Sequence, residues 1–389
     1  MFSSRLRQTA GRNQLAVALD RRRAAGDLIV DLTLSNPTRA GLAYPNGLLS
    51  PMGADLALRY EPDPFGLISA RQAVSDDFAR RGLAVPATRT VLTASTSEAY
   101  SLLFKLLCDP GDVVLAPRPS YPLVEHLTAL DGVSLDHYRL EFHGRWDIDL
   151  QDLRDKADSG RVRAIIMVNP NNPTGSVVTD SELDAIAEIA RDRSLAIISD
   201  EVFADYPISG PQPASALRQQ AALTFVLGGL SKSVGLPQVK LGWIAAGGPP
   251  PLVADALERL ETICDAYLSV STPVQVAAPA LLSAGGVIRT AIHERVRENA
   301  VCLSSLAASN PACAVMPVEA GWYAAVQVPA VASEETIVLD LLDKTGVLVH
   351  PGYFFDFERE AFLVVSLLPK PEIFAAGAEA IFTRAGVHV

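Results

Sequence analysis

The sequence predicts an α/β protein with a three-layer large domain built on a mostly parallel sheet, followed by a smaller α+β lobe. Short apolar runs at 112–117, 163–168, 195–199 and 223–227 have the length and composition of buried strands. Helical patterns alternate with these runs, which is typical of a parallel sheet covered by helices on both faces. Beyond residue 310, short strand and helix patterns mix without that alternation.

Five segments have the apolar spacing of helices: 67–82, 97–109, 180–193, 251–268 and 287–309. Asp180 opens the third of these and is the expected N-cap. We expect an N-terminal arm over 1–45 that packs on the small lobe or on a partner subunit. A large domain over 46–285 and a small C-terminal domain over 286–389 complete the predicted organisation.

The composition excludes several classes of protein. The net charge of −11 over 389 residues gives no electrostatic support for binding nucleic acid or an anionic membrane. No apolar stretch is long enough to span a bilayer, and the N-terminus lacks the apolar core of a secretory signal. The four cysteines and six histidines are dispersed, without metal-ligand spacing. We therefore expect free thiols, a cytoplasmic location and no metal, nucleic-acid or membrane partner.

Polar residues cluster at the ends of the predicted strands, where parallel sheets bind ligands. Lys232 follows one strand in the segment GGLSKSVGLPQVKLGW, where partial burial would lower the pKa of its amine and make it nucleophilic. Asp200 ends the run LAIISD, and a carboxylate there can pair with a protonated ring nitrogen. Taken singly, each also fits an ordinary role, Lys232 as a solvated loop residue and Asp200 as a cap or turn residue.

Three further segments carry chemistry in the same way. NPNNPTG forms a rigid turn that presents the amide of Asn172, and its Asn-Pro bonds are candidates for the cis form. TASTSEA, with Ser95, Thr96 and Ser97, would cradle a phosphate at a helix N-terminus. In PSYP, Tyr121 could lie flat against an aromatic cofactor. A tight loop, ordinary helix capping and a core tyrosine are the respective alternatives.

Together and in this order, these segments resemble the class I/II aminotransferases of the pyridoxal-phosphate (PLP) fold type I. The matching segments are Tyr60…Gly66…Arg71, TASTSEA, PSYP, NPNNPTG, SDEVFADY, and SK followed by Lys240-Leu-Gly-Trp. They cover roughly residues 30 to 370, and several motifs in the family's order are more specific than any one of them.

The resemblance implies a role for each matched residue. Lys232 would carry PLP as a Schiff base, Asp200 would pair with the ring nitrogen, and Tyr121 would stack on the ring. Asn172 would hydrogen-bond the cofactor's 3-oxygen and contact the substrate. The remaining cofactor-binding positions implied in the same chain are Ser95, Thr96, Ser97, Phe203, Ser231 and Lys240.

Two residues of the N-terminal quarter are implied by the same resemblance. Tyr60 would reach the cofactor phosphate of the neighbouring subunit, which implies a homodimer with shared active sites. Asn36, in LSNPT, lies where the family's N-terminal segment closes over the substrate.

The chain departs from the family's pattern at four positions. Phe203 replaces a tyrosine that donates to the 3-oxygen, Lys240 replaces a phosphate-binding arginine, and Gly229 replaces a serine. Val364, in AFLVVSLL, aligns with the arginine that clamps the substrate carboxylate, a contact that contributes roughly 1.5–3 kcal/mol. The candidates to replace that arginine are Arg39, Arg118 and His350.

The expected function is transfer of an amino group between an amino acid and a 2-oxo acid. Because a fold does not determine chemistry, a PLP-dependent lyase or cyclase is the first alternative. A non-catalytic PLP-binding regulator joined to a DNA-binding domain is the second. It is disfavoured by the acidic charge and by the lack of room for such a domain before residue 30. The sequence leaves the amino donor and acceptor open.

Overall fold

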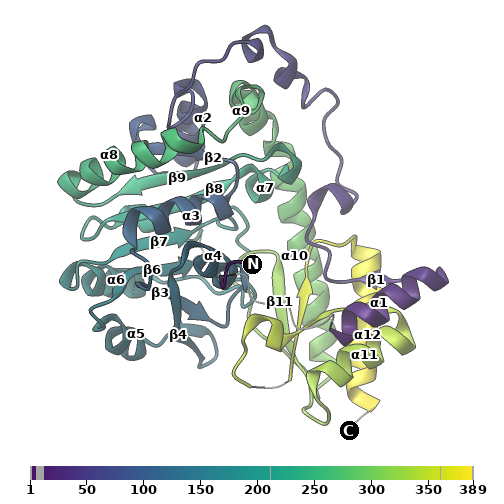
Figure 1. Cartoon of the computed structure of the whole chain (residues 1–389). Helices are drawn as coiled ribbons and strands as arrows, with labels where there is room; N and C mark the ends of the chain where they lie inside the picture. The colour runs from purple at the N-terminus through teal and green to yellow at the C-terminus, as the bar shows by residue number, and fades with distance from the viewer. Residues whose placement is uncertain (1, 6–12, 211, 360, 388–389) are drawn as a thin grey trace.

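An eight-stranded sheet forms the centre of the computed structural model, which describes residues 2–5, 13–210, 212–359 and 361–387 (Figure 1). Five neighbouring strands, from β8 to β4, pair in parallel, while β9 and β5 run antiparallel. The mostly parallel sheet expected from the sequence is therefore confirmed. The order across the sheet is β2 (Thr90–Thr93), β9 (Gly242–Gly247), β8 (Thr224–Gly229), β7 (Ala196–Asp200), β6 (Val162–Val168), β3 (Val113–Arg118), β4 (Ser134–Phe142) and β5 (Trp146–Ile148).

Helices cover both faces of this sheet. One face carries α3 (Thr96–Leu107), α4 (Leu123–Asp131) and α8 (Pro250–Tyr267), and the other carries α5 (Leu150–Ala157) and α6 (Asp180–Asp192). Alternate residues of each buried strand point to opposite faces of the sheet and pack against the helices on each face. In β7, Ile198 joins the apolar cluster of α3 and α8, while Ile197 joins the cluster that contains Ile186 of α6.

The predicted helices are all present, with one correction at a helix start. They appear as α2 (Ile68–Arg80), α3, α6, α8 and α10 (Gly286–Ala308). The prediction that Asp180 caps α6 was wrong, because Thr179 is the N-cap. The Thr179 hydroxyl accepts the N–H of Glu182, and the Glu182 carboxylate accepts the N–H of Thr179 in return. This reciprocal pair forms a capping box and makes Asp180 the first helical residue.

A smaller antiparallel sheet organises the C-terminal lobe. Its order is β10 (Ala314–Val315), β11 (Tyr323–Gln327), β14 (Phe362–Ser366) and β13 (His350–Pro351). Helices α10, α11 (Glu334–Thr345) and α12 (Pro371–Val387) pack around it.

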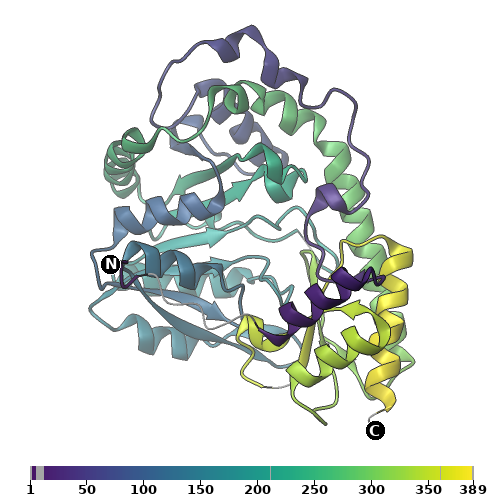
Figure 2. The ribbon, with the colours of Figure 1, turned by 45° about the vertical axis from the view of Figure 1, so that its right-hand side comes forward.

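The N-terminal segment lies on this lobe, as Figure 2 shows for the purple helix α1 (Gln14–Ala25). Arg21 of α1 pairs with Asp343 at 2.8 Å. Strand β1 (Val30–Asp31) runs parallel to β12 (Val347–Leu348). The Ser366 backbone N–H then donates to the Leu32 carbonyl at 2.7 Å, so the segment continues along β14.

Helix α9 (Thr272–Ala284) was not predicted, because two prolines interrupt its pattern. Pro273 lies in the first turn, where a missing N–H is tolerated, but Pro279 lies inside the helix. In the described part of the chain, no helix alone has the length and apolarity needed to cross a membrane. The pair α9 and α10, bent by 55°, meets that test of length and composition only when the two are joined.

Candidate active site

Three polar segments meet at one edge of the parallel sheet, where β6, β7 and β8 end. The turn at 169–175 follows β6, Asp200 is the last residue of β7, and helix α7 (Leu230–Ser233) follows β8. Backbone hydrogen bonds hold them side by side. The Asn169 N–H donates to the Asp200 carbonyl at 2.9 Å, and the Glu201 N–H donates to the Leu227 carbonyl at 3.0 Å. Segments far apart in sequence therefore share one site.

Lys232 lies on α7 with its amine against two aromatic rings. Its Nζ is 5.0 Å from the ring centroid of Trp322 and 5.6 Å from that of Phe203. Burial lowers the pKa of the Lys232 amine to about 8, and the charge of Asp200 partly opposes this effect. A lysine of that pKa is a far better nucleophile near neutral pH than an exposed one.

Asp200 is half-buried and shares its carboxylate oxygens between two donors. Tyr100 donates its hydroxyl to Oδ2 at 3.2 Å, and the Val202 N–H donates to Oδ1 at 3.2 Å. Burial raises the pKa of Asp200 to about 6, although both hydrogen bonds and the Lys232 charge act in the opposite direction. The carboxylate is therefore ionised at neutral pH, but it is poorly compensated within the chain, and a cationic partner would stabilise it.

The turn after β6 holds Asn172 rigidly. Both Asn-Pro bonds, at Pro170 and Pro173, are cis. Asn171 donates its amide to the Pro119 carbonyl at 3.1 Å and to Thr174 Oγ1 at 2.9 Å. Asn172 itself is buried, and its Oδ1 has no hydrogen-bond partner among the described residues. Such a buried amide retains hydrogen-bonding capacity that a ligand can use.

The predicted phosphate-binding turn begins helix α3. Ser95 is the N-cap and accepts the Glu98 N–H at 3.2 Å, which leaves its hydroxyl proton available as a donor. Thr96 and Ser97 form the first turn and are half-buried. The Glu98 carboxylate accepts the Ala94 N–H at 2.6 Å, so one backbone donor of this turn is already in use.

The other predicted phosphate contacts differ in exposure. Ser231 is half-buried, whereas Lys240 is exposed and has a left-handed backbone with φ of 61°. The replacement of serine by Gly229 has a steric reason. A Cβ at this position would lie 3.0 Å from the Leu241 carbonyl oxygen and 3.2 Å from the Gly242 Cα. Backbone from β9 therefore occupies the space that a side chain at 229 would need.

Phe355 lies between Tyr121 and His350, the residue that is paired with Val364. Tyr121 is 49% exposed, and its ring centroid is 6.4 Å from that of Phe355. Val364 is fully buried in β14 and lies opposite His350 of β13, so both side chains point to the same face of the lobe sheet. The ring of His350 is 5.7 Å from Phe355, and burial lowers its pKa.

The remaining predicted substrate contacts lie on the N-terminal segment and at the end of β3. Asn36 is exposed, and its Oδ1 accepts the N–H and hydroxyl of Thr38. Arg39 is also exposed, at the end of the short helix Pro37–Arg39. That helix packs beside Gly235, three residues after Lys232. Arg118 donates Nε to the Asp356 carbonyl at 3.0 Å, which ties it to the backbone of the lobe.

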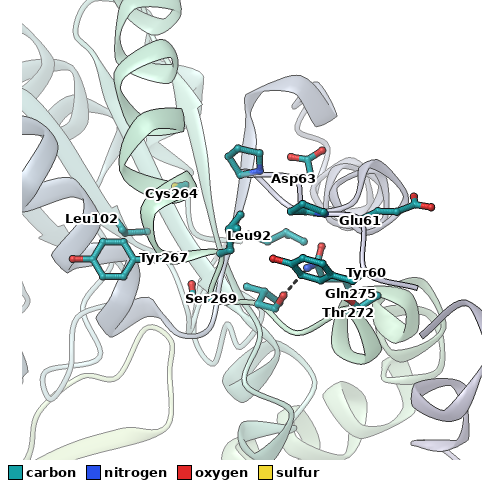
Figure 3. A pocket seen from close by; sticks show the side chains of 15 residues that line it. Tyr60, Glu61, Asp63, Leu92, Leu102, Cys264, Tyr267, Ser269, Thr272 and Gln275 are labelled. Carbon is teal, nitrogen blue, oxygen red and sulfur yellow. Dashed lines mark hydrogen bonds between the residues drawn. The ribbon is translucent and has the colours of Figure 1, made fainter. Parts of the chain in front are cut away.

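Tyr60 lies apart from this group within the chain. It is 74% exposed and borders a shallow hollow whose lining includes neither Lys232 nor Asp200. Figure 3 shows its ring beside Gln275 and Thr272. A single chain therefore does not bring Tyr60 to the other predicted cofactor contacts.

Two aromatic residues of the site were missed from the sequence. Trp322 is fully buried and packs on Phe203 and Tyr206, with ring centroids 5.3 and 5.2 Å away. The Tyr206 hydroxyl donates to the backbone carbonyl of Lys232. Tyr206 ends the segment SDEVFADY, and Trp322 follows Gly321 just before a strand, but neither pattern indicates a contact with Lys232.

Comparison with known families decides the identity of this fold and site. The model of the family described as "Aminotransferase class I and II" matches residues 53–376. The chain belongs to the class I and II aminotransferases. It is a PLP-dependent enzyme that transfers amino groups.

Individual relatives extend this result. A glutamate-pyruvate aminotransferase, AlaA of Haemophilus influenzae, is 28% identical over 88% of this chain and 87% of its own length. The crystal structure of an aminotransferase from Escherichia coli has a TM-score of 0.87 and 26% identity, and covers 99% of this chain and 98% of that chain. The S-alkyl-thiohydroximate lyase SUR1 of Arabidopsis thaliana is 33% identical over 56% of this chain and 48% of its own length.

The described residues fit the cofactor of this family. Asn172 has an unpartnered buried amide oxygen, Asp200 is a carboxylate that lacks a full charge partner, and Lys232 has a lowered pKa. The ring nitrogen of PLP would pair with Asp200 and its aldehyde with Lys232, while the Asn172 amide would donate from Nδ2 to the 3-oxygen, because its Oδ1 can only accept.

Proposed function

We propose that this aminotransferase binds PLP through a Schiff base to Lys232 and moves an amino group between an amino acid and a 2-oxo acid. The observation that carries the proposal is the lowered pKa of Lys232 beside Asp200 at the strand ends. A pKa of about 8 leaves roughly a tenth of the amines neutral at pH 7, against ~0.03% for an ordinary value of 10.5. Lys232 is thus prepared to attack an aldehyde.

The residues around Lys232 take complementary roles. Bound PLP supplies a ring that accepts electrons from the substrate's Cα–H bond. With PLP and substrate bound, Nζ of Lys232 would be the base that takes the proton from the substrate's Cα. Asp200 keeps the ring nitrogen protonated, and Asn172 donates its amide to the 3-oxygen.

The other contacts hold the cofactor in place. Tyr121 stacks on the ring, and Phe203 borders it without donating a hydrogen bond. The phosphate is held by hydroxyls, backbone N–H groups and one ammonium group, from Ser95, Thr96, Ser97, Ser231 and Lys240. Because helix α3 begins at this turn, its dipole also favours the phosphate.

The substrate carboxylate lacks the usual arginine. Asn172 and Asn36 are the polar groups that we propose to contact it, and Arg39 is the candidate cation on the N-terminal segment. We propose alanine and glutamate, with pyruvate and 2-oxoglutarate as acceptors, as the first substrates to test, because the relative AlaA is a glutamate-pyruvate aminotransferase.

A homodimer with shared sites would explain the position of Tyr60. Large apolar side chains are exposed around it, namely Leu56, Leu58, Ile68 and Tyr267. In a dimer, Tyr60 would reach the partner's cofactor phosphate.

The test uses hybrid dimers, formed by co-expression of Tyr60→Phe and Lys232→Ala chains. The hybrid has one site with both residues intact, so activity should return to up to half of the wild-type level, whereas independent sites would leave only the activity of the Tyr60→Phe chains.

We also propose that the enzyme works in the cytoplasm. All four cysteines, at 108, 264, 302 and 313, are free thiols, and burial raises the pKa of each. Such inert, reduced thiols suit a reducing compartment. Fractionation of the source cells with an antibody to the chain would test the location.

The central experiment compares Lys232→Ala with Lys344→Ala, an exposed lysine of α11. Wild type and Lys344→Ala should develop the absorbance of a PLP imine, and borohydride should fix the cofactor on the peptide that contains Lys232. Lys232→Ala should lose the fixed cofactor and at least about 10³-fold in amino transfer. Wild-type turnover by Lys232→Ala would refute the assignment.

A lyase reaction is the second candidate, because a relative is a named lyase and Val364 replaces the carboxylate clamp. A lyase would release ammonia or sulfide from the substrate without a 2-oxo acid. Measuring both products with and without the acceptor separates the two reactions. Release that is independent of the acceptor would favour the lyase.

A further inference from the structure

Side chains from outside helix α7 satisfy its C-terminal carbonyls. The helix has only four residues, so its last carbonyl groups need partners from elsewhere. Tyr206 donates its hydroxyl to the carbonyls of Lys232 and Ser233, and Arg289 donates Nε to the Ser233 carbonyl at 3.0 Å. A guanidinium is favourable at this end of a helix, because the C-terminal carbonyls carry partial negative charge. The backbone that carries Lys232 is therefore fixed by two side chains.

Arg289 is itself held by a four-membered ion network. Its Nη2 lies 2.9 Å from Asp77 Oδ1, and its Nε lies 3.3 Å from Asp205 Oδ2. Arg80 pairs with the same two carboxylates, at 3.0 and 2.5 Å. The side chains of Arg289, Asp77 and Asp205 are nearly buried, with 11, 13 and 7% exposed. Two cations and two anions balance, so the network orients Arg289 without adding net charge beside Lys232.

The location of Arg289 links α7 to the rest of the molecule. It lies near the start of α10, the long helix that runs from the large domain to the small lobe (Figure 1). One turn later, His293 Nε2 bonds the Pro207 carbonyl. Towards the other end, Asn299 donates to the carbonyls of Leu367 and Pro369 at 2.8 Å. One helix thus fixes the Lys232 turn and the segment that follows β14.

Stability alone gives little reason for this arrangement. Buried ion pairs often stabilise a protein no more than apolar residues of the same size, since desolvation offsets the attraction. Their geometry is directional, however, and guanidinium groups hold carboxylates and carbonyls in defined orientations. A reacting amine misplaced by about 1 Å can lower a rate by about 100-fold. The network is therefore well suited to fixing the orientation of Arg289 and, through it, the position of the Lys232 backbone.

We propose that Arg289 is a positioning residue for Lys232, which acts with Tyr206 through the backbone of α7 to hold Nζ against Trp322 and beside Asp200. The inference rests on the proposed role of Lys232 as the residue that binds PLP. Arg289 does not touch the cofactor or the substrate. Its effect passes through the Ser233 carbonyl, and Arg80, which shares its carboxylates without contacting α7, provides the matched control.

The test compares Arg289→Met with Arg80→Met in the full-length protein. The first readout needs no cofactor: the reactivity of Lys232 toward limiting acetic anhydride is measured by mass spectrometry as a function of pH. The second is the rate at which PLP is captured, measured by absorbance. The third is urea unfolding, which measures the loss of stability in each variant.

Arg289→Met should slow PLP capture by about 10- to 100-fold and shift the pH profile of Lys232 acetylation. Arg80→Met should leave the rate of PLP capture and the acetylation of Lys232 within about twofold of the wild type, although it removes a charge from the same network. If both variants change Lys232 in proportion to their loss of stability, Arg289 is only structural and the proposal fails. The proposal would also be overturned if Lys232 reacted in both variants as it does in the wild type.

Two further variants keep the test decisive if Arg289→Met does not fold. Tyr206→Phe removes the other cap and keeps the ring, and it should also slow capture. Arg289→Lys keeps the charge but loses the Nε donor. It should therefore recover more of the stability that Arg289→Met loses than of the rate of PLP capture. Wild-type protein that fails to add PLP to Lys232 would refute the proposed function, whereas the acetylation comparison would still test the positioning.

Discussion

The amine of Lys232 lies 5.0 Å from the ring centroid of Trp322, so an aromatic residue just before β11 covers the lysine that follows β8. Two effects of this contact on the Lys232 pKa oppose each other. Cation–π attraction favours the charged amine by about 0.5–2 kcal/mol, whereas the burial to which Trp322 contributes favours the neutral amine. Burial lowers the pKa of Lys232 to about 8 against the opposing charge of Asp200, and we expect the burial by Trp322 to outweigh the cation–π attraction.

Replacing Trp322 by leucine should therefore raise the pKa of Lys232 from about 8 towards 10.5, because water would enter the space left by the ring. The pH dependence of Lys232 acetylation in the cofactor-free protein measures this change. Trp146→Leu is the control, because Trp146 is a buried tryptophan that packs on Phe142 and Phe357 instead. A fall in the Lys232 pKa would show that the cation–π term outweighs burial.

Asp200→Asn should stabilise the cofactor-free protein at neutral pH. Since burial raises the folded-state pKa of Asp200 to about 6 from 3.8, the folded state holds this proton more tightly than the unfolded chain. The contribution of Asp200 to the stability of the wild type should thus fall as the pH rises through about 4 to 6 and then level off. Asparagine removes this term, and the free energy of unfolding at about pH 8 should rise by about 1–3 kcal/mol.

Urea unfolding at about pH 4, 6 and 8 checks this result, and the two proteins should converge near the lowest pH. The variant should also bind PLP more weakly, because the ring nitrogen would lose its anionic partner. A variant that is less stable than the wild type at pH 8 would contradict the expectation.

Phe203→Tyr should lower the pH at which the absorbance of bound PLP changes. The added hydroxyl would supply the hydrogen bond to the 3-oxygen that this chain lacks, and it would stabilise the oxyanion. In the cofactor-free protein, the same hydroxyl is placed in a buried site against Trp322, which should cost about 1–3 kcal/mol. An absorbance titration and thermal unfolding measure the two effects. Phe357→Tyr, which alters a different aromatic cluster, should leave the titration unchanged.

Gly229→Ser should fail to restore the phosphate contact found elsewhere in the family. Its Cβ would lie 3.0 Å from the Leu241 carbonyl oxygen, so the strands must shift at a cost of about 1–3 kcal/mol. We expect a lower melting temperature and weaker PLP binding. Gly286→Ser is the control, because a Cβ there meets nothing within 4 Å, and it should change stability by less than about 0.5 kcal/mol. Tighter PLP binding by Gly229→Ser would show that the strands separate easily.

The sequence predicted the parallel sheet well, because strands such as β6 and β7 consist almost entirely of buried apolar residues. It did not predict α9, since Pro279 breaks the local pattern and packing against α2 and the short helices Ser50–Gly53 and Asp55–Leu58 compensates for it. Parallel sheets bind ligands at the carboxyl ends of their strands, and this rule correctly predicted that Lys232 and Asp200 lie at one edge of the large sheet. Trp322 was beyond sequence reasoning, because its contact with Lys232 exists only once the lobe has closed on the sheet.

The pairing of β1 with β12 has a consequence for synthesis of the chain. Val30 pairs with Val347, far away in the sequence, so β1 is synthesised long before the strand with which it pairs. The large domain can fold from the residues between them, while the segment around β1 stays unpaired. A fusion partner placed at the N-terminus would sit next to this late-closing strand. The last step of assembly would then be the pairing of the β1 segment with β12 and with the end of β14.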